Sequence, residues 1–278
     1  MSAVLRIFPS PTRTPGALAE IAGVVPASRL GVRPLPRTIL TGIPQVDELT
    51  GGVPRGGLTE IFGPTTSGRT SLLFALLAQM TAREEVCALV DVSDAFDPHS
   101  AEAASVDLKR VLWVRCGRKV ARSSFLVSRK SQASAEKRET RNEKLAAVEQ
   151  ALRATDLLLE AGGFGLVAVD LGDIPSAITR RVPLTSWFRF RRAVENAATA
   201  LVVVGQEASA KSCASLVLKT RHLAISNEHL AKTSAGPAHA RLLSGLQLEV
   251  EVLNSRVWQR KPVRSATTTF ESRASWFG

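Results

Sequence analysis

The chain has 278 residues, of which 45% are hydrophobic, and it carries a formal net charge of +11. This length suffices for one large α/β domain with a well-buried core, and no run approaches the roughly 18 apolar residues of a membrane-spanning helix. The positive excess favours an anionic partner, first nucleic acid and then a membrane surface, although a solvated basic tail or a generally basic proteome gives the same total.

Residues 1–37 are rich in proline and predict an arm attached loosely to the rest of the chain. Only residues 16–24 have the composition of a short helix. Arginine and proline interrupt the apolar run that an export signal needs, so no export is expected. Cys87, Cys116 and Cys213 lie far apart, which is typical of reduced, buried thiols. A cytoplasmic protein is therefore predicted.

From residue 38 onward, short apolar runs alternate with segments of helical periodicity, after a helical turn at residues 41–49. This alternation predicts a doubly wound, mostly parallel sheet of the α/β class. Beyond Cys213 the helical periodicity ends, which indicates antiparallel strands at one edge. We expect a core of residues 38–271 and a C-terminal tail of residues 272–278. The expected strands are 58–62, 86–91, 109–116, 164–170, 200–206, 215–225, 245–253 and 257–270, and the expected helices are 71–80, 143–161 and 186–198.

One segment interrupts the alternation. Between residues 117 and 145 the chain has nine lysines and arginines against three glutamates, a surplus of +6 that exceeds half of the net charge. The intervening residues are mostly Ser, Ala, Gln and Thr, which offer little apolar surface to bury. We therefore predict a mobile basic insertion over residues 118–142.

A phosphate-binding loop follows the first strand of the core. Residues 63–71 match the pattern G-x-x-x-x-G-K-[ST], except that Arg69 takes the place of the lysine. A strand before the loop and a helix after it form the setting in which backbone N–H groups bind an anion. An alternative is that the loop is retained only as an element of the fold. The residues expected to contact a nucleotide are Gly63, Pro64, Thr65, Thr66, Ser67, Gly68, Arg69, Thr70 and Ser71.

The residues around this loop resemble the RecA recombinase family. The resemblance rests on Thr-Gly-Ile-Pro-Gln-Val-Asp at 41–47, on residues 51–64, and on Ala-Leu-Val-Asp-Val-Ser-Asp-Ala-Phe-Asp-Pro at 88–98. It continues through residues 106–108, 167–170, 202–206 and 248–256, and so extends over about residues 38–271. It implies a RecA-like P-loop ATPase core that uses ATP and Mg²⁺ and acts on DNA.

The resemblance also implies roles for single residues. Gly63, Gly68 and the amides between them would hold phosphates. Thr70 would bind Mg²⁺ through its hydroxyl, and Asp170, at the end of an apolar strand, would hold the same ion through water. Gln206 matches the glutamine that senses the γ-phosphate and relays the nucleotide state to the DNA-binding loop.

Two departures from the family weaken the expected catalytic set. Ser93 stands where the family has the glutamate that activates water, and a hydroxyl cannot act as a general base near neutral pH. Asp94 is adjacent, but neighbouring side chains diverge, so it is a poor substitute. The planar guanidinium of Arg69 is larger than the ammonium for which the loop is shaped, although it can still neutralise a phosphate. We expect nucleotide binding with weak or lost ATPase activity.

The segments expected to bind DNA also differ from the family. Only residues 207–212 separate Gln206 from the next strand, too few for the long mobile loop of RecA proteins. After Asp170, five arginines alternate with three aromatic residues, an arrangement suited to single-stranded DNA. Alternatively, Trp187 and Phe190 pack inward with Val194 while the arginines are merely solvated. The candidate DNA-binding residues are Arg180, Arg181, Arg189, Arg191 and Arg192.

These features predict a RecA-like DNA repair or recombination protein that acts as an accessory in the DNA-damage response. The weakened catalytic set and the Pro-Leu-x-x-Trp-x-x-x-Arg-Arg segment at 183–192 resemble the ImuA-type RecA-like accessory proteins, which act beside an error-prone polymerase. One alternative is an active DNA-stimulated ATPase that promotes strand exchange, against which the short 207–212 connection argues. Another is an interaction scaffold that binds neither ligand strongly, against which the basic surplus argues. Self-association through the N-terminal arm, as in RecA filaments, is a further possibility.

Overall fold

The computed structural model describes residues 36–116, 132–195, 197–223, 245–255 and 266–273. The chain divides into two units, Met1–Pro34 and Leu35–Gly278, and the description below concerns the second. The short helix predicted at residues 16–24 lies outside the described residues, as do residues 274–278 of the tail predicted at 272–278, whereas residues 272–273 belong to a strand.

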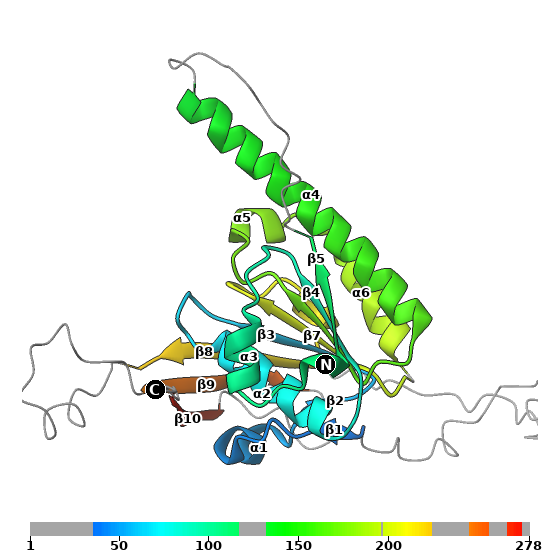
Figure 1. The fold of residues 1–278 in the computed structure, drawn as a ribbon, viewed down its shortest axis with the longest axis vertical. Helices are drawn as coiled ribbons and strands as arrows, with labels where there is room; N and C mark the ends of the chain where they lie inside the picture. The colour runs from blue at the N-terminus through cyan, green and yellow to red at the C-terminus, as the bar shows by residue number, and fades with distance from the viewer. Residues whose placement is uncertain (1–35, 117–131, 196, 224–244, 256–265, 274–278) are drawn as a thin grey trace, which may run out of the picture. The chain divides into compact units, whose positions relative to one another are not determined.

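An eight-stranded sheet forms the centre of the fold, in the order β10-β9-β8-β3-β7-β6-β4-β5 (Figure 1). The strands from β8 to β5 pair in parallel, whereas β9 pairs antiparallel with both β8 and β10. The expected α/β class, with antiparallel strands added at one edge, is therefore confirmed. The strands are β3 (Leu58–Phe62), β4 (Cys87–Asp91), β5 (Val111–Arg115), β6 (Leu166–Asp170), β7 (Ala200–Gly205), β8 (Leu216–His222), β9 (Gly245–Ser255) and β10 (Ala266–Arg273), and a separate pair is formed by β1 (Thr38–Ile39) and β2 (Val53–Pro54).

Helices cover both faces of the sheet, so the core has two apolar layers (Figure 1). On one face α2 (Arg69–Ala82) packs with α1 (Pro44–Thr50) and α3 (Pro98–Ala103). The other face is covered by α4 (Gln132–Ala161), α5 (Ser176–Thr179) and α6 (Leu184–Val194). Because the central strands are buried on both sides, their sequences are continuous apolar runs rather than alternating ones.

Two short 3₁₀ helices, Leu108–Arg110 and Lys211–Cys213, complete the described elements. The helical turn predicted at residues 41–49 corresponds to α1. Its entry is fixed by the Asp47 carboxylate, which accepts hydrogen bonds from the backbone N–H groups of Thr41 at 2.7 Å and Gly42 at 3.0 Å.

Helix α4 begins at Gln132, whereas the sequence predicted a start at residue 143. Residues 132–142 of the predicted basic insertion are thus helical, and residues 118–131 lie outside the described residues. Figure 1 shows the amino end of α4 running past the sheet. Ala, Gln, Glu, Lys and Arg have high helix propensity, so a segment with little apolar surface still continues a helix that is anchored further along.

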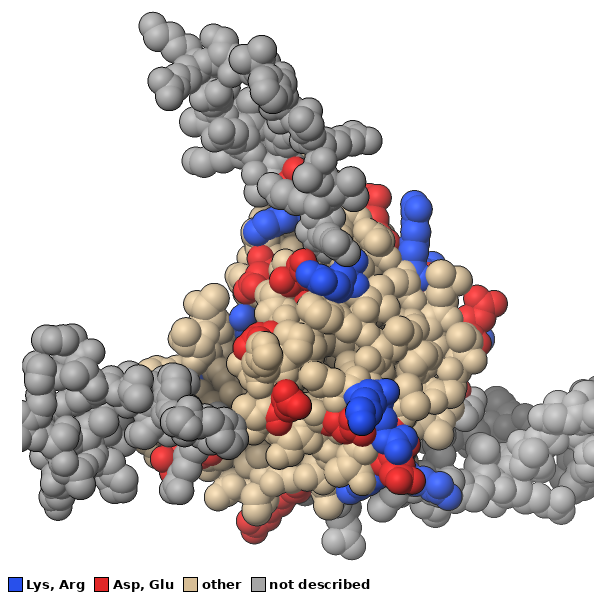
Figure 2. Space-filling model, in the orientation of Figure 1, with Lys and Arg blue, Asp and Glu red and all other residues tan. Residues whose placement is uncertain are grey.

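The positive charge of the chain is unevenly distributed. The residues whose side chains are described include 18 Lys and Arg but 21 Asp and Glu, a net charge of −3. The other 18 basic and 4 acidic residues contribute +14, which restores the total of +11. Figure 2 accordingly shows blue and red side chains interspersed on the described surface. In the described part of the chain, no helix is both long and apolar enough to cross a membrane.

Candidate nucleotide-binding site

The loop at residues 63–68 joins the end of β3 to the amino end of α2. Gly68 precedes the helix with a left-handed φ of +85°, and Thr66 also has a positive φ of +64°. No side chain of the described residues caps the helix, so its first amides face no competing acceptor of that kind. Thr65 and Thr70 are exposed. This backbone geometry is suited to an anion at the amino end of a helix.

Both glycines of the motif are also required by the strands behind the loop. A Cβ atom at Gly63 would lie 2.3 Å from the carbonyl oxygen of Thr220 in β8. A Cβ atom at Gly68 would lie 2.4 Å from a Cδ atom of Leu248 in β9. Real Cβ atoms do not come this close, so a side chain at Gly63 would meet the backbone of β8, and one at Gly68 would require Leu248 to shift.

Arg69 turns away from the exposed side of the loop and binds two backbone carbonyls. Its Nη1 donates to the carbonyl oxygens of Gly63 and Gly205, both at 2.9 Å. Gly205 ends β7, the strand between β3 and β6, so the guanidinium joins two strand ends. The residue is only 7% exposed, and this burial lowers the pKa of the guanidinium, against the opposing effect of Asp170 and Asp173.

Asp170 and Gln206 are placed at the same edge of the sheet. The Oδ1 atom of Asp170 accepts a hydrogen bond from the Gly172 amide at 2.8 Å. Burial raises the pKa of the Asp170 carboxyl to about 6; the Gly172 amide lowers it and the nearby Asp91 raises it further. The side-chain nitrogen of Gln206 donates to the Gly172 carbonyl at 3.0 Å. The glutamine therefore joins the end of β7 to the turn after β6.

No carboxylate is available at the position of Ser93. Asp91 and Asp170 are direct partners in the parallel pairing of β4 and β6, which places Ser93 two residues beyond β4 and beside the Asp170 strand. The Ser93 Oγ atom is buried and has no hydrogen-bond partner among the described residues. Asp94 is bound by Arg115 through two hydrogen bonds of 2.5 and 2.8 Å, so its carboxylate is already paired.

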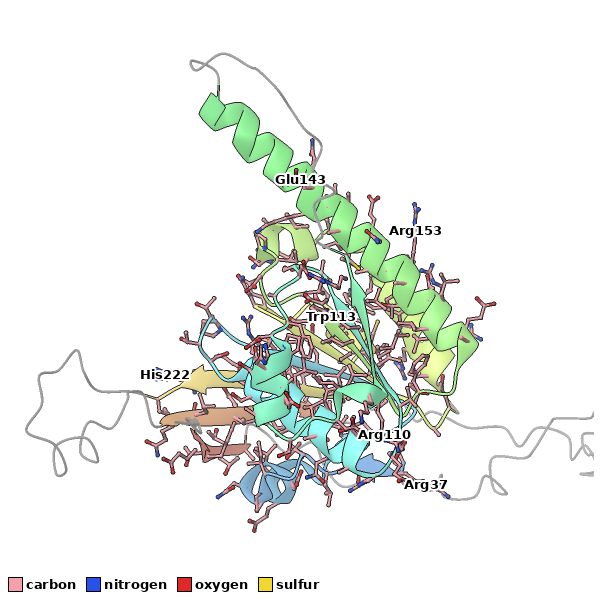
Figure 3. All side chains as sticks on the ribbon, viewed as in Figure 1. Arg37, Arg110, Trp113, Glu143, Arg153 and His222 are labelled. Atoms are coloured by element: carbon pink, nitrogen blue, oxygen red, sulfur yellow. The ribbon has the colours of Figure 1, made fainter. Side chains whose placement is uncertain are left out.

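The loop that carries Ser93 is ordered by Asp91. The Asp91 carboxylate accepts hydrogen bonds from three backbone amides, those of Ser93, Ala95 and Phe96, at 2.9–3.2 Å. It also accepts one at 3.2 Å from the indole nitrogen of Trp113, which lies on β5 (Figure 3). Asp91 therefore has a structural role in this loop.

Glu60 is a site residue that the sequence analysis missed. It lies in β3, is 1% exposed, and its Oε1 atom accepts hydrogen bonds from the Ser209 amide at 2.5 Å, the Ser209 hydroxyl at 3.0 Å and the Ala210 amide at 3.0 Å. Burial raises the pKa of its carboxyl, and the hydrogen bonds from Ser209 and Ala210 oppose this effect. The only signal in the sequence is one charged residue within an apolar strand.

Some residues of the arginine-rich segment at 180–194 are buried in the core, and others are exposed. Trp187, Phe190 and Val194 are buried in the apolar layer, which confirms the packing alternative for these three residues. Phe188 is 42% exposed. Arg180 forms an ion pair with Glu207, and Arg189 forms one with Asp156 of α4. Arg181 and Arg192 are exposed, and neither forms an ion pair with the described residues.

The region around the loop is similar to known proteins. Residues 37–117 match the family model of the RecA N-terminal domain. The RecA protein of Synechococcus sp. (strain CC9902) is 41% identical over 87 residues, which are 31% of this chain and 22% of that protein. RecA of Ruegeria pomeroyi is 32% identical over 120 residues, 43% and 26% of the two chains, and RecA of Symbiobacterium thermophilum is 32% identical over 145 residues, 51% and 32%.

In each of these three comparisons, less than two thirds of the relative's own length is matched. The matched family region runs from β1 through the phosphate-binding loop and α2 to the end of β5, and therefore includes both Arg69 and Ser93. Residues 37–117 are thus similar to the RecA N-terminal domain, and the sheet order and the loop between β3 and α2 are consistent with a RecA-like core.

Proposed function

We propose that this chain is a RecA-like protein of DNA recombination or repair that binds ATP and DNA and hydrolyses ATP slowly or not at all. One observation carries the proposal: the backbone of the phosphate-binding loop is retained, while the side chains that hydrolysis needs are replaced or already engaged. Binding and hydrolysis depend on different parts of such a site, so one can persist without the other.

The residues present fit a nucleotide and its metal ion. The uncapped amino end of α2 would bind phosphate oxygens through backbone N–H groups. Thr70 is exposed at the first turn of α2, and Asp170 keeps one carboxylate oxygen free of hydrogen bonds from the described residues. These two side chains would hold Mg²⁺, directly and through water, and the ion would neutralise phosphate charge.

Hydrolysis requires an oriented water molecule and stabilisation of charge that develops on the phosphoryl oxygens. Ser93 cannot accept a proton from water, and Asp94 is paired with Arg115. Nη1 of Arg69 donates to the backbone carbonyls of Gly63 and Gly205, so it is already engaged within the protein. Turnover is therefore expected to be slow.

The DNA contact is proposed for the exposed side of α6 and the residues just before it. Residues 180–192 contain five arginines and no acidic residue, although the described side chains as a whole carry a net charge of −3. Phe188, which is 42% exposed, lies between Arg181 and Arg192 in the sequence and offers a ring face on which a base can stack. Arginines for phosphates and an aromatic face for bases are suited to single-stranded DNA.

An accessory role is proposed rather than strand exchange. The connection after Gln206 is short and leads directly into the 3₁₀ helix Lys211–Cys213, so it offers no long mobile loop for pairing two DNA molecules. A partnership with an error-prone polymerase, and self-association through residues 1–37, belong to the same proposal. A strand-exchange assay with homologous DNA tests the distinction, because product formation would favour the recombinase alternative.

The nucleotide part of the proposal is tested by measuring binding and turnover separately. ATP with Mg²⁺ should raise the melting temperature of the wild-type protein, while phosphate release stays near background with and without DNA. Thr70→Val removes the hydroxyl proposed to bind the metal ion and should reduce the rise in melting temperature that ATP with Mg²⁺ causes. The double variant Arg69→Lys with Ser93→Glu should gain turnover, and robust DNA-stimulated release by the wild type would contradict the proposal.

The DNA part is tested with variants of the exposed arginines. Arg181→Ala and Arg192→Ala should each weaken binding to single-stranded DNA and reduce the slope of affinity against salt by about one. Phe188→Ala should cost about 1–3 kcal/mol with little change in slope, because stacking releases no counterions. Arg153→Ala removes an exposed arginine of α4 (Figure 3) and serves as the control. Equal affinities for all four variants would exclude this surface.

A further inference from the structure

The connection that follows β7, residues 205–210, is attached to the core by side chains from three other segments. We propose that Arg69 and Glu60 are positioning residues that fix this connection in one arrangement whether or not a nucleotide is bound, so that Gln206 does not relay the nucleotide state. The inference rests on the proposed nucleotide binding for its functional meaning, but the attachment itself is a property of the protein without ligand.

Arg69 provides the first attachment, at the start of the connection. The Gly205 carbonyl accepts from Arg69 Nη1 at 2.9 Å and also from the Gly63 amide at 3.2 Å, so both of its acceptor positions are used. The same Nη1 atom holds the Gly63 carbonyl at 2.9 Å. One buried guanidinium thus joins the beginning of the phosphate-binding loop to the end of β7. A guanidinium suits this task because it offers fixed, charged donors that remain protonated.

Glu60 provides the second attachment, at the far end of the connection. Its Oε1 atom accepts three hydrogen bonds, two from backbone amides and one from the Ser209 hydroxyl. The side chain is buried beneath the connection and belongs to β3, the strand that also leads into the phosphate-binding loop. Residues 205 and 209–210 are therefore both held to β3 or to the loop that continues it.

The middle of the connection is held as well. Gln206 donates its side-chain amide to the Gly172 carbonyl, and Glu207 forms an ion pair with Arg180. A glutamine that signals must exchange one set of hydrogen bonds for another when phosphate arrives. Here the buried side chains of Arg69 and Glu60 hold the backbone before Gln206, at residue 205, and after it, at residues 209–210. Such an exchange of hydrogen bonds would therefore not move the backbone of the connection. An element with only one accessible arrangement cannot carry coupling between two sites.

Amide hydrogen exchange of residues 205–211 tests the inference, with the full-length protein and with ATP and Mg²⁺ as the ligand. In the wild type, exchange should be slow without ligand and should change less than about 2-fold at saturating ATP. In Arg69→Lys, the single ammonium cannot hold both carbonyls in the same geometry. Exchange without ligand should rise about 10-fold or more, and ATP should slow it again.

Arg55→Lys is the matched control. Arg55 is a half-buried arginine that pairs with Glu85 and donates to the carbonyl of Ala198, and its described side-chain hydrogen bonds do not involve the connection. Its replacement should leave exchange at residues 205–211 unchanged. A general loss of stability would raise amide exchange at residues 205–211 in both variants. An exchange rate that ATP slows in Arg69→Lys alone would not follow from destabilisation.

The outcomes separate this inference from the proposed function. Wild-type exchange at 205–211 that responds strongly to ATP overturns the inference, as does an Arg69→Lys protein whose exchange without ligand equals that of the wild type. If the wild type shows no ATP-dependent melting shift, the proposed nucleotide binding fails, and the comparison without ligand still decides the attachment. Glu60→Met removes the acceptor of the three hydrogen bonds and so tests the same connection from its other end should Arg69→Lys not fold. Unchanged exchange at 209–211 in Glu60→Met also overturns the inference.

Discussion

Replacing Gly68 by alanine is expected to destabilise the protein through its contact with β9, independently of any nucleotide. The φ of +85° places an alanine in the left-handed region, which costs about 1–2 kcal/mol. The new Cβ would also lie 2.4 Å from a Cδ atom of Leu248, which is fully buried, and overpacking of this kind costs about 1–3 kcal/mol. The sum is about 2–5 kcal/mol, so the variant should melt well below the wild type.

Two further single variants and one double variant isolate the packing contribution. Gly162→Ala has a similar φ of +66° but nothing within 4 Å of the new Cβ, so it should lose only the conformational cost of about 1–2 kcal/mol. Leu248→Ala alone should cost about 2–5 kcal/mol because it leaves a cavity. In the double variant with Gly68→Ala, the cavity accommodates the methyl group, so the combined loss should be about 1–3 kcal/mol smaller than the sum.

Urea unfolding followed by tryptophan fluorescence, with Trp113 and Trp187 in the folded core, measures all four proteins without ligand. Gly68→Ala should be clearly less stable than Gly162→Ala, and the loss in the double variant should be smaller than the sum of the two single losses. Equal losses in the two glycine variants, or strict additivity with Leu248→Ala, would refute the view that packing against β9 requires a glycine at this position.

Three other variants, two of them paired with a control variant, test the buried polar groups and the α6 packing by urea unfolding. Burial raises the pKa of Glu60 in the folded protein above its ordinary 4.5, so the folded protein binds this proton more tightly than the unfolded chain does. The resulting contribution to the free energy of unfolding is fully present below pH 4.5 and is lost as the pH rises through the pKa of the folded state. The stability of Glu60→Gln relative to wild type should therefore increase from pH 5 to 8, and a constant difference would contradict this. Asp91→Asn should lose about 1–3 kcal/mol of unfolding free energy because loop amides lose an acceptor. Asp97→Asn, at an exposed helix cap, should lose almost none. Equal losses in the two variants would argue against the structural role of Asp91. Trp187→Ala should lose about 3–5 kcal/mol and the exposed Phe188→Ala less than about 1 kcal/mol, and the reverse order would show that α6 is turned the other way.

The sequence predicted the elements whose patterns are local. The strand at 58–62 was placed at its observed bounds, and the loop and its helix followed from the spacing of two glycines and a hydroxyl residue. Asp170 was placed at the end of its strand because an apolar run that ends in a carboxylate is visible without the fold. The inward packing of Trp187 was already one of the two alternatives, since helical spacing fixes which residues share a face.

What the sequence did not predict depends on contacts between distant segments. The partners of Arg69 include a carbonyl 136 residues away, and those of Glu60 lie 149 and 150 residues away, so no local pattern contains them. The early start of α4 was missed for a different reason. Its first residues have little to bury, and composition alone does not distinguish a solvated helix from an irregular loop.

The division of charge between the described side chains and the rest of the chain has an evolutionary consequence. The residues that build the sheet, the loop and the apolar layers carry a slightly negative net charge, and the residues that make the chain basic are almost entirely others. Substitutions among the latter can raise or lower the attraction of the chain to a polyanion while the charge of the described side chains stays at −3. The net charge of related sequences can therefore differ widely even where the residues of the sheet and the loop are the same.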